Sequence, residues 1–280
     1  MNVTVLGAKG MLGTDLMAAL ANAGINARGY DLPDVDITLD NGGLERIGRC
    51  DWIVNCAAYT NVDGAEKDSD KAFAVNRDGV RRIAECCKRS NSSLMHISTD
   101  YVFDGTSGTA YAEDAPVNPV NVYGRSKLDG ENEVLSAGVK HLIVRTQSLF
   151  GINGANFVRA IMSRLEAGTG ALKVVNDQVS SPTYTVHLAD AILRLLRTDK
   201  QGIVHVSASG ECSWYEFACV IAASIKPGAE VLPVTSSEYI RPARRPAYSV
   251  LDKGLYTSWT GSGMPSWKEG LKEYLERIKT

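Results

Sequence analysis

The chain opens with a short apolar strand pattern, a glycine-rich turn and an amphipathic helix pattern, and this order constrains its fold more than any other feature. The run from Asn2 to Leu6 leads into Gly7, Gly10 and Gly13, spaced G-x-x-G-x-x-G. Such glycines permit a tight turn and a close approach of the backbone to a pyrophosphate, whose charge the N-terminal amides of the helix would face. The pattern predicts a dinucleotide site, although an ordinary turn would also accommodate these glycines.

The residues after the first helix predict a second strand with an acidic end. Gly24 is well placed to end the helix, and the run "NARGYDLPD" ends its strand near Tyr30 and Asp31. Asp31 stands where a carboxylate accepts a ribose 2′-hydroxyl, which favours NAD(H). Arg28 could instead meet a 2′-phosphate, and a solvated acid at a strand end is a third interpretation.

Short apolar strands alternate with helical periods through the first half of the chain. The runs "NVTVLG", "WIVNCAA", "SLMHIS" and "KHLIVRT" have strand character, and "MLGTDLMAALANAG" and "DKAFAVNRDGVRRIAECCKRSN" have helical spacing. This alternation predicts an α/β fold with a Rossmann-type doubly wound parallel sheet and ligands at the carboxyl ends of its strands. After Phe150 the elements shorten and prolines multiply. We expect an NAD(P)-binding domain over residues 1–150 and a smaller C-terminal substrate-binding domain over 151–280, with some elements returning to pack on the first.

The composition narrows the classes of partner. A chain of 280 residues with 44% hydrophobic content can bury a sizeable core, and a net charge of −2 without a basic stripe argues against nucleic acid. No run reaches membrane-spanning length and the N-terminus has no signal-peptide pattern, so we expect a cytoplasmic protein without a membrane partner. The six cysteines show no C-x-x-C and no zinc-ligand spacing, which predicts reduced structural thiols and no metal.

A tyrosine and a lysine stand four residues apart in "NVYGRSKLDGENEV". On one helical face Tyr123 and Lys127 would be neighbours and could act on the same small ligand. A tyrosine titrates near pH 10 unless a nearby cation favours the phenolate, and Lys127 could be that cation. A surface pair without function is the alternative, because the spacing alone is common.

Longer segments resemble a known family. "NCAAYTNVDGAE", "HISTDYVFDG", "NVYGRSK", "DQVSSPTY" and "RPARRPAYSVLD" are similar to segments of the extended short-chain dehydrogenase/reductases, in the branch that reduces 4-keto nucleotide sugars. The resemblance spans nearly the whole chain. It implies NADPH- or NADH-dependent reduction of the 4-keto group of a dTDP-linked 6-deoxyhexulose, with a nucleotide sugar as the partner and a possible homodimer.

The resemblance also assigns roles to single residues. Tyr123 would protonate the ketone oxygen, Lys127 would hold the nicotinamide ribose and lower the pKa of Tyr123, and Thr99 would hydrogen-bond the same oxygen. Asp100, Ser148 and Arg244 would contact the sugar nucleotide. The expected cofactor contacts are Gly7, Gly10, Met11, Leu12, Gly13, Asp31, Asp36, Ile37, Ala57, Ala58, Tyr59, Tyr123 and Lys127.

One departure concerns the sugar contact. Family members usually carry a tryptophan after the "HLIVRT" strand, where this chain has Ser148. That change alters the expected contact with the sugar and leaves the hydride chemistry unaffected. Leu149 or Phe150 could fill part of the space.

Other polar and aromatic clusters have more than one interpretation. The "RPARRP" loop could bind a diphosphate through Arg244 or Arg245, which the sequence does not separate, or form a solvated or ion-paired loop. Glu131 and Glu133 are expected to be solvated on a polar helix, although such a pair could bind a divalent ion between subunits. Ser213 is a predicted helix cap, and the aromatic residues after it, Trp214 and Tyr215, are expected in the core.

Two rival functions share the fold. A nucleotide-sugar epimerase or dehydratase would use the same Tyr/Lys pair, but dehydratases carry Asp-Glu after the threonine where this chain has Asp100-Tyr101. A non-catalytic dinucleotide-binding regulatory subunit is the second rival. The presence of Thr99, Tyr123 and Lys127 together argues against it.

Overall fold

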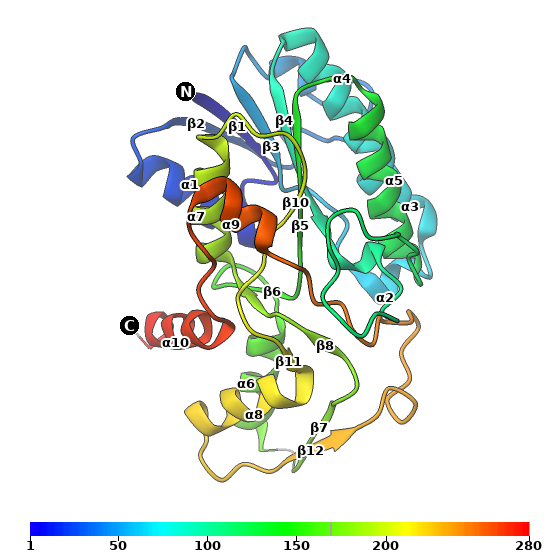
Figure 1. Cartoon of the computed structure of the whole chain (residues 1–280), viewed down its shortest axis with the longest axis vertical. Helices are drawn as coiled ribbons and strands as arrows, with labels where there is room; N and C mark the ends of the chain where they lie inside the picture. Colours follow the sequence, from blue (N-terminus) through cyan, green and yellow to red (C-terminus); the bar gives the residue numbers. More distant parts are fainter. Residues whose placement is uncertain (169, 280) are drawn as a thin grey trace.

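A parallel sheet forms the centre of the molecule (Figure 1). The structure is a computed structural model that describes residues 1–168 and 170–279. The six strands of the sheet are β1 (Asn2–Leu6), β2 (Asn26–Tyr30), β3 (Trp52–Asn55), β4 (Ser93–Thr99), β5 (His141–Thr146) and β10 (Gly202–His205). They lie in the order β10-β5-β4-β3-β1-β2, and all neighbours are parallel. The prediction of an α/β fold with a Rossmann-type doubly wound sheet is confirmed.

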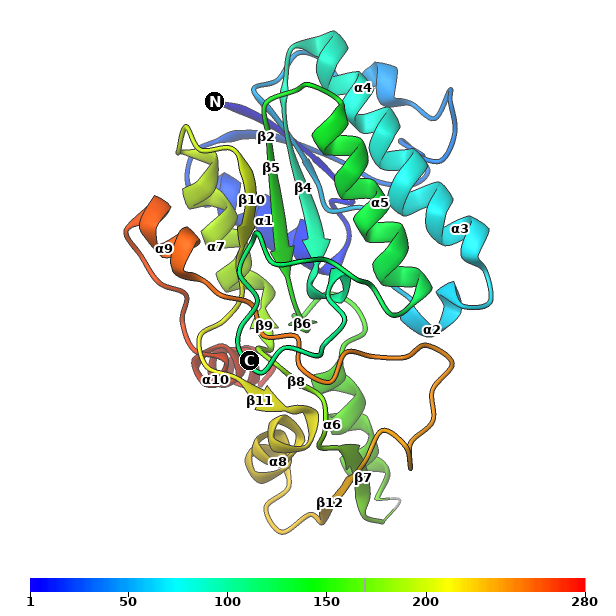
Figure 2. The same ribbon diagram turned by 45° about the vertical axis from the view of Figure 1, so that its right-hand side comes forward.

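Helices cover both faces of the sheet (Figure 2). The first face carries α1 (Met11–Asn22), α7 (Thr185–Leu196) and α9 (Gly254–Thr260), and the second carries α4 (Val80–Ser90) and α5 (Val122–Ser136). Each face buries its own hydrophobic cluster, with Leu16 and Leu20 on the first and Ile83 and Val134 on the second. Burial on both faces is what makes the strands read as continuous apolar runs in the sequence.

The long helical pattern after β3 folds as a helix that contains a π-helical turn. It consists of α3 (Ser69–Phe73), a wide π-helical turn over Ala74–Gly79, and α4. The side chain of Asn76 in this turn donates to the Tyr59 carbonyl and the Ser126 hydroxyl at 3.0 Å each and accepts from the Tyr59 amide at 2.9 Å. The helical spacing of this segment is therefore matched by helical structure, and the π-helical turn places Asn76 against the loop around Tyr59.

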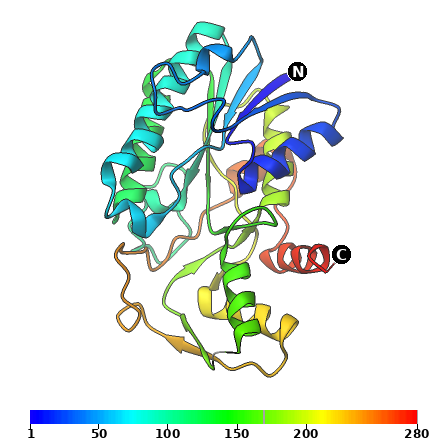
Figure 3. The ribbon, with the colours of Figure 1, turned by 180° about the vertical axis from the view of Figure 1, so that it is seen from behind.

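A second group of elements lies beyond the carboxyl ends of the strands (Figure 3). Its helices pack around a separate hydrophobic cluster that includes Phe150 and Phe217. The elements on this side are β6 (Leu149–Phe150), α6 (Phe157–Ala167), β7 (Leu172–Val175), β8 (Val179–Ser180), β9 (Thr183–Tyr184), β11 (Cys212–Ser213), α8 (Trp214–Ile225), β12 (Val231–Val234) and α10 (Trp267–Arg277). Short segments on the sheet side are η1 (Leu44–Arg46), α2 (Val62–Ala65) and η3 (Asp100–Val102).

The chain crosses between the two groups more than once. Helix α7 packs against α1, and β10 pairs with β5, although both follow residue 150. Leu188 and Val204 accordingly belong to the same cluster as Leu16. These elements, although late in the chain, therefore lie with the sheet.

The helix cap predicted at Ser213 is present, but the aromatic residues after it are not in the core. The Ser213 side chain and Glu216 form a capping box at the start of α8. Trp214 and Tyr215 are both half-buried. The ring of Trp214 is tilted by 45° against that of Phe157 at a centroid distance of 4.5 Å, and it lies between the cluster of the second group and the cavity described below.

The order of the strands reverses between β1 and β3. The first connection of the chain runs from β1 to β2, and the later ones run in the opposite direction to β4, β5 and β10. The loops that leave β1 and β3 therefore diverge, and a crevice opens between them at the carboxyl edge. No helix in the described part of the chain is long and apolar enough to cross a membrane.

Candidate active site

A cavity of about 980 Å³ lies at this carboxyl edge, between the sheet and the second group of elements. Loops after β1, β2, β3, β4 and β5 form one side, and Ala155, Phe157, Trp214 and Arg245 form part of the other. Its volume suits a dinucleotide together with part of a second ligand. All expected site residues line the cavity except Gly13 and Arg244.

The three glycines of the first turn have three different roles. Gly7 has φ +74°, and a Cβ there would lie 2.7 Å from the Ala57 amide nitrogen, so only glycine fits against the β3 loop. A Cβ on Gly13 would collide with the Gly7 carbonyl oxygen, which explains why Gly13 packs under the turn and does not line the cavity. At Gly10 a Cβ would meet only that oxygen, at 3.2 Å. The open side of Gly10, at the N-terminus of α1, fits a pyrophosphate.

The acidic residue at the end of β2 binds the glycine turn itself. The Asp31 carboxylate accepts from the Lys9 amide at 2.8 Å and from the Leu32 amide at 2.9 Å. Lys9 lines the cavity beside it, whereas Arg28 does not. A cation that could meet a 2′-phosphate is therefore supplied by the turn, and not by the strand.

Further along the same rim, Asp36 and Ile37 line the cavity as expected. The Asp36 carboxylate accepts from the Thr38 amide at 2.9 Å and from the Thr38 hydroxyl at 2.7 Å. Ala57, Ala58 and Tyr59 lie opposite, in the loop after β3. These residues form the wall along which a dinucleotide could extend.

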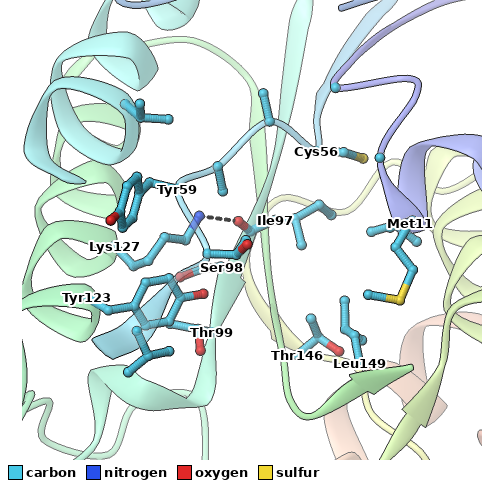
Figure 4. A pocket seen from close by; sticks show the side chains of 18 of the residues that line it. Met11, Cys56, Tyr59, Ile97, Ser98, Thr99, Tyr123, Lys127, Thr146 and Leu149 are labelled. Carbon is cyan, nitrogen blue, oxygen red and sulfur yellow. Dashed lines mark hydrogen bonds between the residues drawn. The ribbon is translucent and has the colours of Figure 1, made fainter. Parts of the chain in front are cut away.

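Tyr123 and Lys127 face the cavity from α5 (Figure 4). The Asn121 side chain caps this helix by accepting from the Gly124 amide at 2.7 Å, which fixes the start of the turn that carries Tyr123. Lys127 is only 1% exposed, and its Nζ donates to the Ile97 carbonyl at 2.6 Å. The interpretation of this pair as a surface feature is wrong, because both side chains point inward beside β4.

The expected effect of the lysine on the tyrosine is absent. Burial raises the pKa of Tyr123 to about 12, with the Thr99 hydroxyl opposing and Asp100 adding to the rise. Lys127 is held instead against Ile97 and, at 3.3 Å, against His96 Nε2. Burial lowers the pKa of Lys127 to about 8, although the charge of Glu131 acts in the opposite direction. Tyr123 is consequently a phenol over the whole physiological range.

Asp100 is a buried carboxyl next to Thr99. It is 2% exposed, and its Oδ1 accepts from the Thr99 hydroxyl at 3.0 Å. Burial raises its pKa to about 7, although the hydroxyls of Ser249 and Thr99 act in the opposite direction. An ordinary carboxyl would be fully ionised at pH 7, whereas Asp100 loses its proton near that pH.

Under the floor of the site lies a buried ion pair. Glu131 accepts from Arg145 Nη2 at 2.7 Å and from the Ser98 hydroxyl at 2.5 Å, and both charged residues are at most 3% exposed. The expectation of a solvated Glu131 is wrong, since its carboxylate neutralises Arg145 beneath β4 and β5. Glu133 remains half-buried. Within the described residues no group of three or more His, Cys, Asp or Glu could hold a metal ion.

The structure distinguishes Arg244 from Arg245, which have the same expected role in the sequence. Arg245 lines the cavity and donates to both oxygens of Asp63 in α2 at 2.9 Å. Burial lowers the pKa of Arg245, but the pairing with Asp63 and the nearby Tyr101 raise it overall. Arg244 is exposed and does not line the cavity, and its carbonyl accepts from the Asn121 side chain at 2.8 Å. The expected contact of Arg244 with the substrate is thus not supported by its position, because Arg245, held by Asp63, is the arginine that faces the cavity.

Sequence reasoning missed several residues of the cavity. Thr146 and Gln147, after β5, and Phe157 and Trp214, from the second group, all line it. Gln147 stands next to Ser148 in the segment that departs from the family, which was the available signal. No signal in the sequence pointed to the ring pair of Phe157 and Trp214, since the two residues are far apart in the chain.

Comparisons with known proteins agree on one family. The family model described as the RmlD substrate binding domain matches residues 1–280. The dTDP-4-dehydrorhamnose reductase of Mycobacterium tuberculosis is 40% identical over 96% of this chain and 90% of its own. A probable dTDP-4,6-dihydroxy-2-methyloxan-3-one 4-ketoreductase of Streptomyces antibioticus is also 40% identical, over 96% and 92%. The crystal structure of a Bacillus anthracis dTDP-4-dehydrorhamnose reductase in complex with NADP has a TM-score of 0.93 at 38% identity, covering 100% of this chain and 99% of that one.

Proposed function

The chain belongs to the RmlD substrate binding domain family, and from this we propose that it is an NADPH- or NADH-dependent reductase of a dTDP-4-keto sugar. The specific reaction proposed is reduction of dTDP-4-dehydro-6-deoxy-L-mannose to dTDP-L-rhamnose. One observation carries the proposal. A glycine turn fitted to a pyrophosphate and the Thr99, Tyr123 and Lys127 side chains line a single cavity.

The residues proposed to hold the cofactor follow the rim of the cavity. Gly10 and the N-terminal amides of α1 would receive the pyrophosphate, and Asp31 and Lys9 lie where the adenosine ribose would reach. Ala57 to Tyr59 would line the path toward Lys127. When bound, the reduced nicotinamide supplies the hydride.

The chain's own residues supply the proton. Hydride addition to a ketone carbon leaves an oxyanion, so a donor must already be aimed at that oxygen. Tyr123 fits this role because its raised pKa keeps the phenol protonated until charge develops on the substrate. The phenolic O–H bond breaks, the new alcohol O–H bond forms, and Thr99 would hydrogen-bond the same oxygen. Lys127, as an ammonium below about pH 8, would bind the nicotinamide ribose hydroxyls.

The position after Asp100 supports a reductase over a dehydratase. Tyr101 stands there, with its ring edge-on to Tyr123 at 5.8 Å, and its pKa is raised by burial. A phenol in that place offers no carboxylate for the elimination of water. Reduction needs only the hydride and the single proton of Tyr123.

Coenzyme consumption against a panel of keto sugars tests the proposal. Purified protein with NADPH or NADH would be mixed with dTDP-, UDP- and GDP-linked 4-keto-6-deoxy sugars, and the decrease in absorbance at the reduced nicotinamide band recorded together with the alcohol product. We expect stoichiometric consumption with the dTDP-linked 4-keto sugar. No consumption with any member of the panel would refute the assignment as a reductase.

The organisation of the chain is part of the proposal. Two hydrophobic clusters on either side of the cavity support a cofactor unit and a sugar unit, close to the expected division at residue 150.

A cytoplasmic location is supported by six free cysteines. Light scattering on the purified protein tests the homodimer that the resemblance allows.

A further inference from the structure

Three buried polar atoms along one wall of the cavity have no hydrogen-bond partner within residues 1–168 and 170–279. They are Asp100 Oδ2, Thr146 Oγ1 and Gln147 Oε1. Each residue lines the cavity and is at most 4% exposed. Unpaired polar atoms are costly to bury, so native proteins seldom collect them in one place without a ligand to pair with them.

These atoms surround the place proposed for the reacting ketone. In the parallel pair β4–β5, Thr99 is the register partner of Thr146, and Asp100 and Gln147 follow directly. Figure 4 shows Thr146 across the cavity from Tyr123. A sugar whose ketone oxygen meets Tyr123 and Thr99 would therefore present its neighbouring carbons to Thr146 and Gln147.

The chemistry of the glutamine selects the ligand group. Gln147 Nε2 donates to the buried Ser207 hydroxyl at 3.0 Å, which leaves Oε1 as an acceptor facing the cavity. A ketone oxygen is itself an acceptor and cannot satisfy it, whereas a hydroxyl can. In a 4-keto-6-deoxyhexose, the carbons next to C4 are C3, which carries a hydroxyl, and C5, which carries a methyl group.

We propose that Gln147, together with Thr146, binds the 3-hydroxyl of the sugar and so fixes which ring face meets the hydride. Ser148 is poorly suited to this task, because its hydroxyl lies 2.8 Å from that of Ser180. Gln147 thereby supplies the orientation that an aromatic ring at position 148 would otherwise give. This specificity role rests on the proposed function, since it takes the ligand to be a nucleotide sugar.

Binding selectivity tests the proposal without relying on turnover. Calorimetry would measure the Kd of dTDP-L-rhamnose and of its 3-deoxy analogue in the presence of NADP⁺, for the wild-type protein and for Gln147→Met. A site that pairs a buried acceptor with a ligand hydroxyl rejects the analogue lacking it by roughly 10²-fold or more. We expect Gln147→Met to reduce this preference below about tenfold by weakening only the hydroxylated ligand.

The chain offers a matched control and a second variant. Gln178 is also a buried glutamine whose Nε2 donates to a serine hydroxyl, at 2.8 Å to Ser236, but it does not line the cavity. Gln178→Met should keep the wild-type preference. Thr146→Val, which keeps the shape of the side chain, should lower it, and this variant decides the matter if Gln147→Met does not fold.

The possible outcomes separate this inference from the proposed function. An unchanged preference in Gln147→Met, or equal weakening of both ligands, overturns the role of Gln147. Failure of the wild-type protein to bind either nucleotide sugar overturns both proposals. Selective binding of the hydroxylated ligand without consumption of NADPH on the 4-keto sugar supports the role of Gln147 and overturns the reductase assignment alone.

Discussion

The wild-type protein should lose stability as the pH rises from acid to neutral, because Asp100 loses its proton in the folded state. Replacement of Asp100 by asparagine should abolish this loss. Burial raises the pKa of this carboxyl from 3.8 to about 7. Between those two values the folded protein holds a proton on Asp100 that the unfolded chain has lost. The free energy of unfolding therefore falls as the pH rises through this window, and the loss is complete above about pH 7.

The size of the effect follows from the pKa difference. Each pKa unit corresponds to about 1.4 kcal/mol, so the wild-type protein should lose about 4 kcal/mol of stability between about pH 4 and pH 8 because of Asp100. No screening by solvent reduces this figure, since the side chain is 2% exposed. Asp100→Asn cannot ionise and keeps the acceptor for the Thr99 hydroxyl, so it should lack this loss.

Urea unfolding at intervals from pH 4 to pH 8 measures the difference. The free energy of unfolding of Asp100→Asn minus that of the wild type should rise by about 4 kcal/mol across the range, and contributions from other titrating groups cancel in the subtraction. A difference that stays constant within about 1 kcal/mol would refute the reasoning, because it would mean that Asp100 titrates as an ordinary carboxyl.

Asp104, four residues further along, is the matched control. Hydrogen bonds from the Thr106 amide and hydroxyl lower its pKa to about 2. Its ionised form therefore stabilises the folded state above pH 3.8, and this contribution disappears as the pH falls through 2. The difference between Asp104→Asn and the wild type should be flat from pH 4 to pH 8, in contrast to that of Asp100→Asn.

The remaining predictions concern the proposed site residues. Tyr123→Phe should lower kcat by roughly 10²–10⁴-fold with little change in nucleotide-sugar Kd, and near wild-type kcat would exclude Tyr123 as the proton donor. Lys127→Met should weaken NADPH binding and lower kcat. The wild-type rate should fall as the pH rises through about 8, where the Lys127 ammonium loses its proton. If the rate of the variant falls in the same way, Lys127 is not the source of this pH dependence. Gly10→Val should fold, because its Cβ meets only the Gly7 oxygen. Calorimetry should show that it binds NADPH at least roughly tenfold more weakly. An unchanged affinity would mean that the turn does not bind the pyrophosphate. Asp31→Ala should raise the ratio of kcat/KM for NADPH over NADH, and an unchanged ratio would show that this carboxylate does not contact the ribose.

The sequence predicted those features that local chemistry determines. Apolar runs bounded by turns predicted β1, β3, β4 and β5, because strands buried on both faces must be apolar throughout, whereas β10 was not predicted. Gly24 and Ser213 marked helix ends correctly. Glycine readily adopts the left-handed backbone that follows a helix, and a serine side chain can cap the first amides of one, so both signals are local to the residue. The glycine turn was located for the same reason.

The features that it did not predict depend on contacts between distant segments. The π-helical turn at Ala74–Gly79 carries Asn76, which binds the loop at Tyr59 and the helix at Ser126. The inward position of Arg245 depends on Asp63, far from it in the chain. Likewise, the pKa of Lys127 is set mainly by burial, which no spacing of residues within one helix reveals.

The repeated passage of the chain between the two sides of the cavity restricts how this protein can be recombined with relatives. Helix α7 and strand β10 complete the sheet side, while α6 precedes them and α8 follows them on the other side. A chimera joined at a single point near residue 150 would carry the α7 of one parent against the α1 of the other. A graft intended to change the sugar alone has to be spliced at each crossing, in separate blocks on either side of α7 and β10.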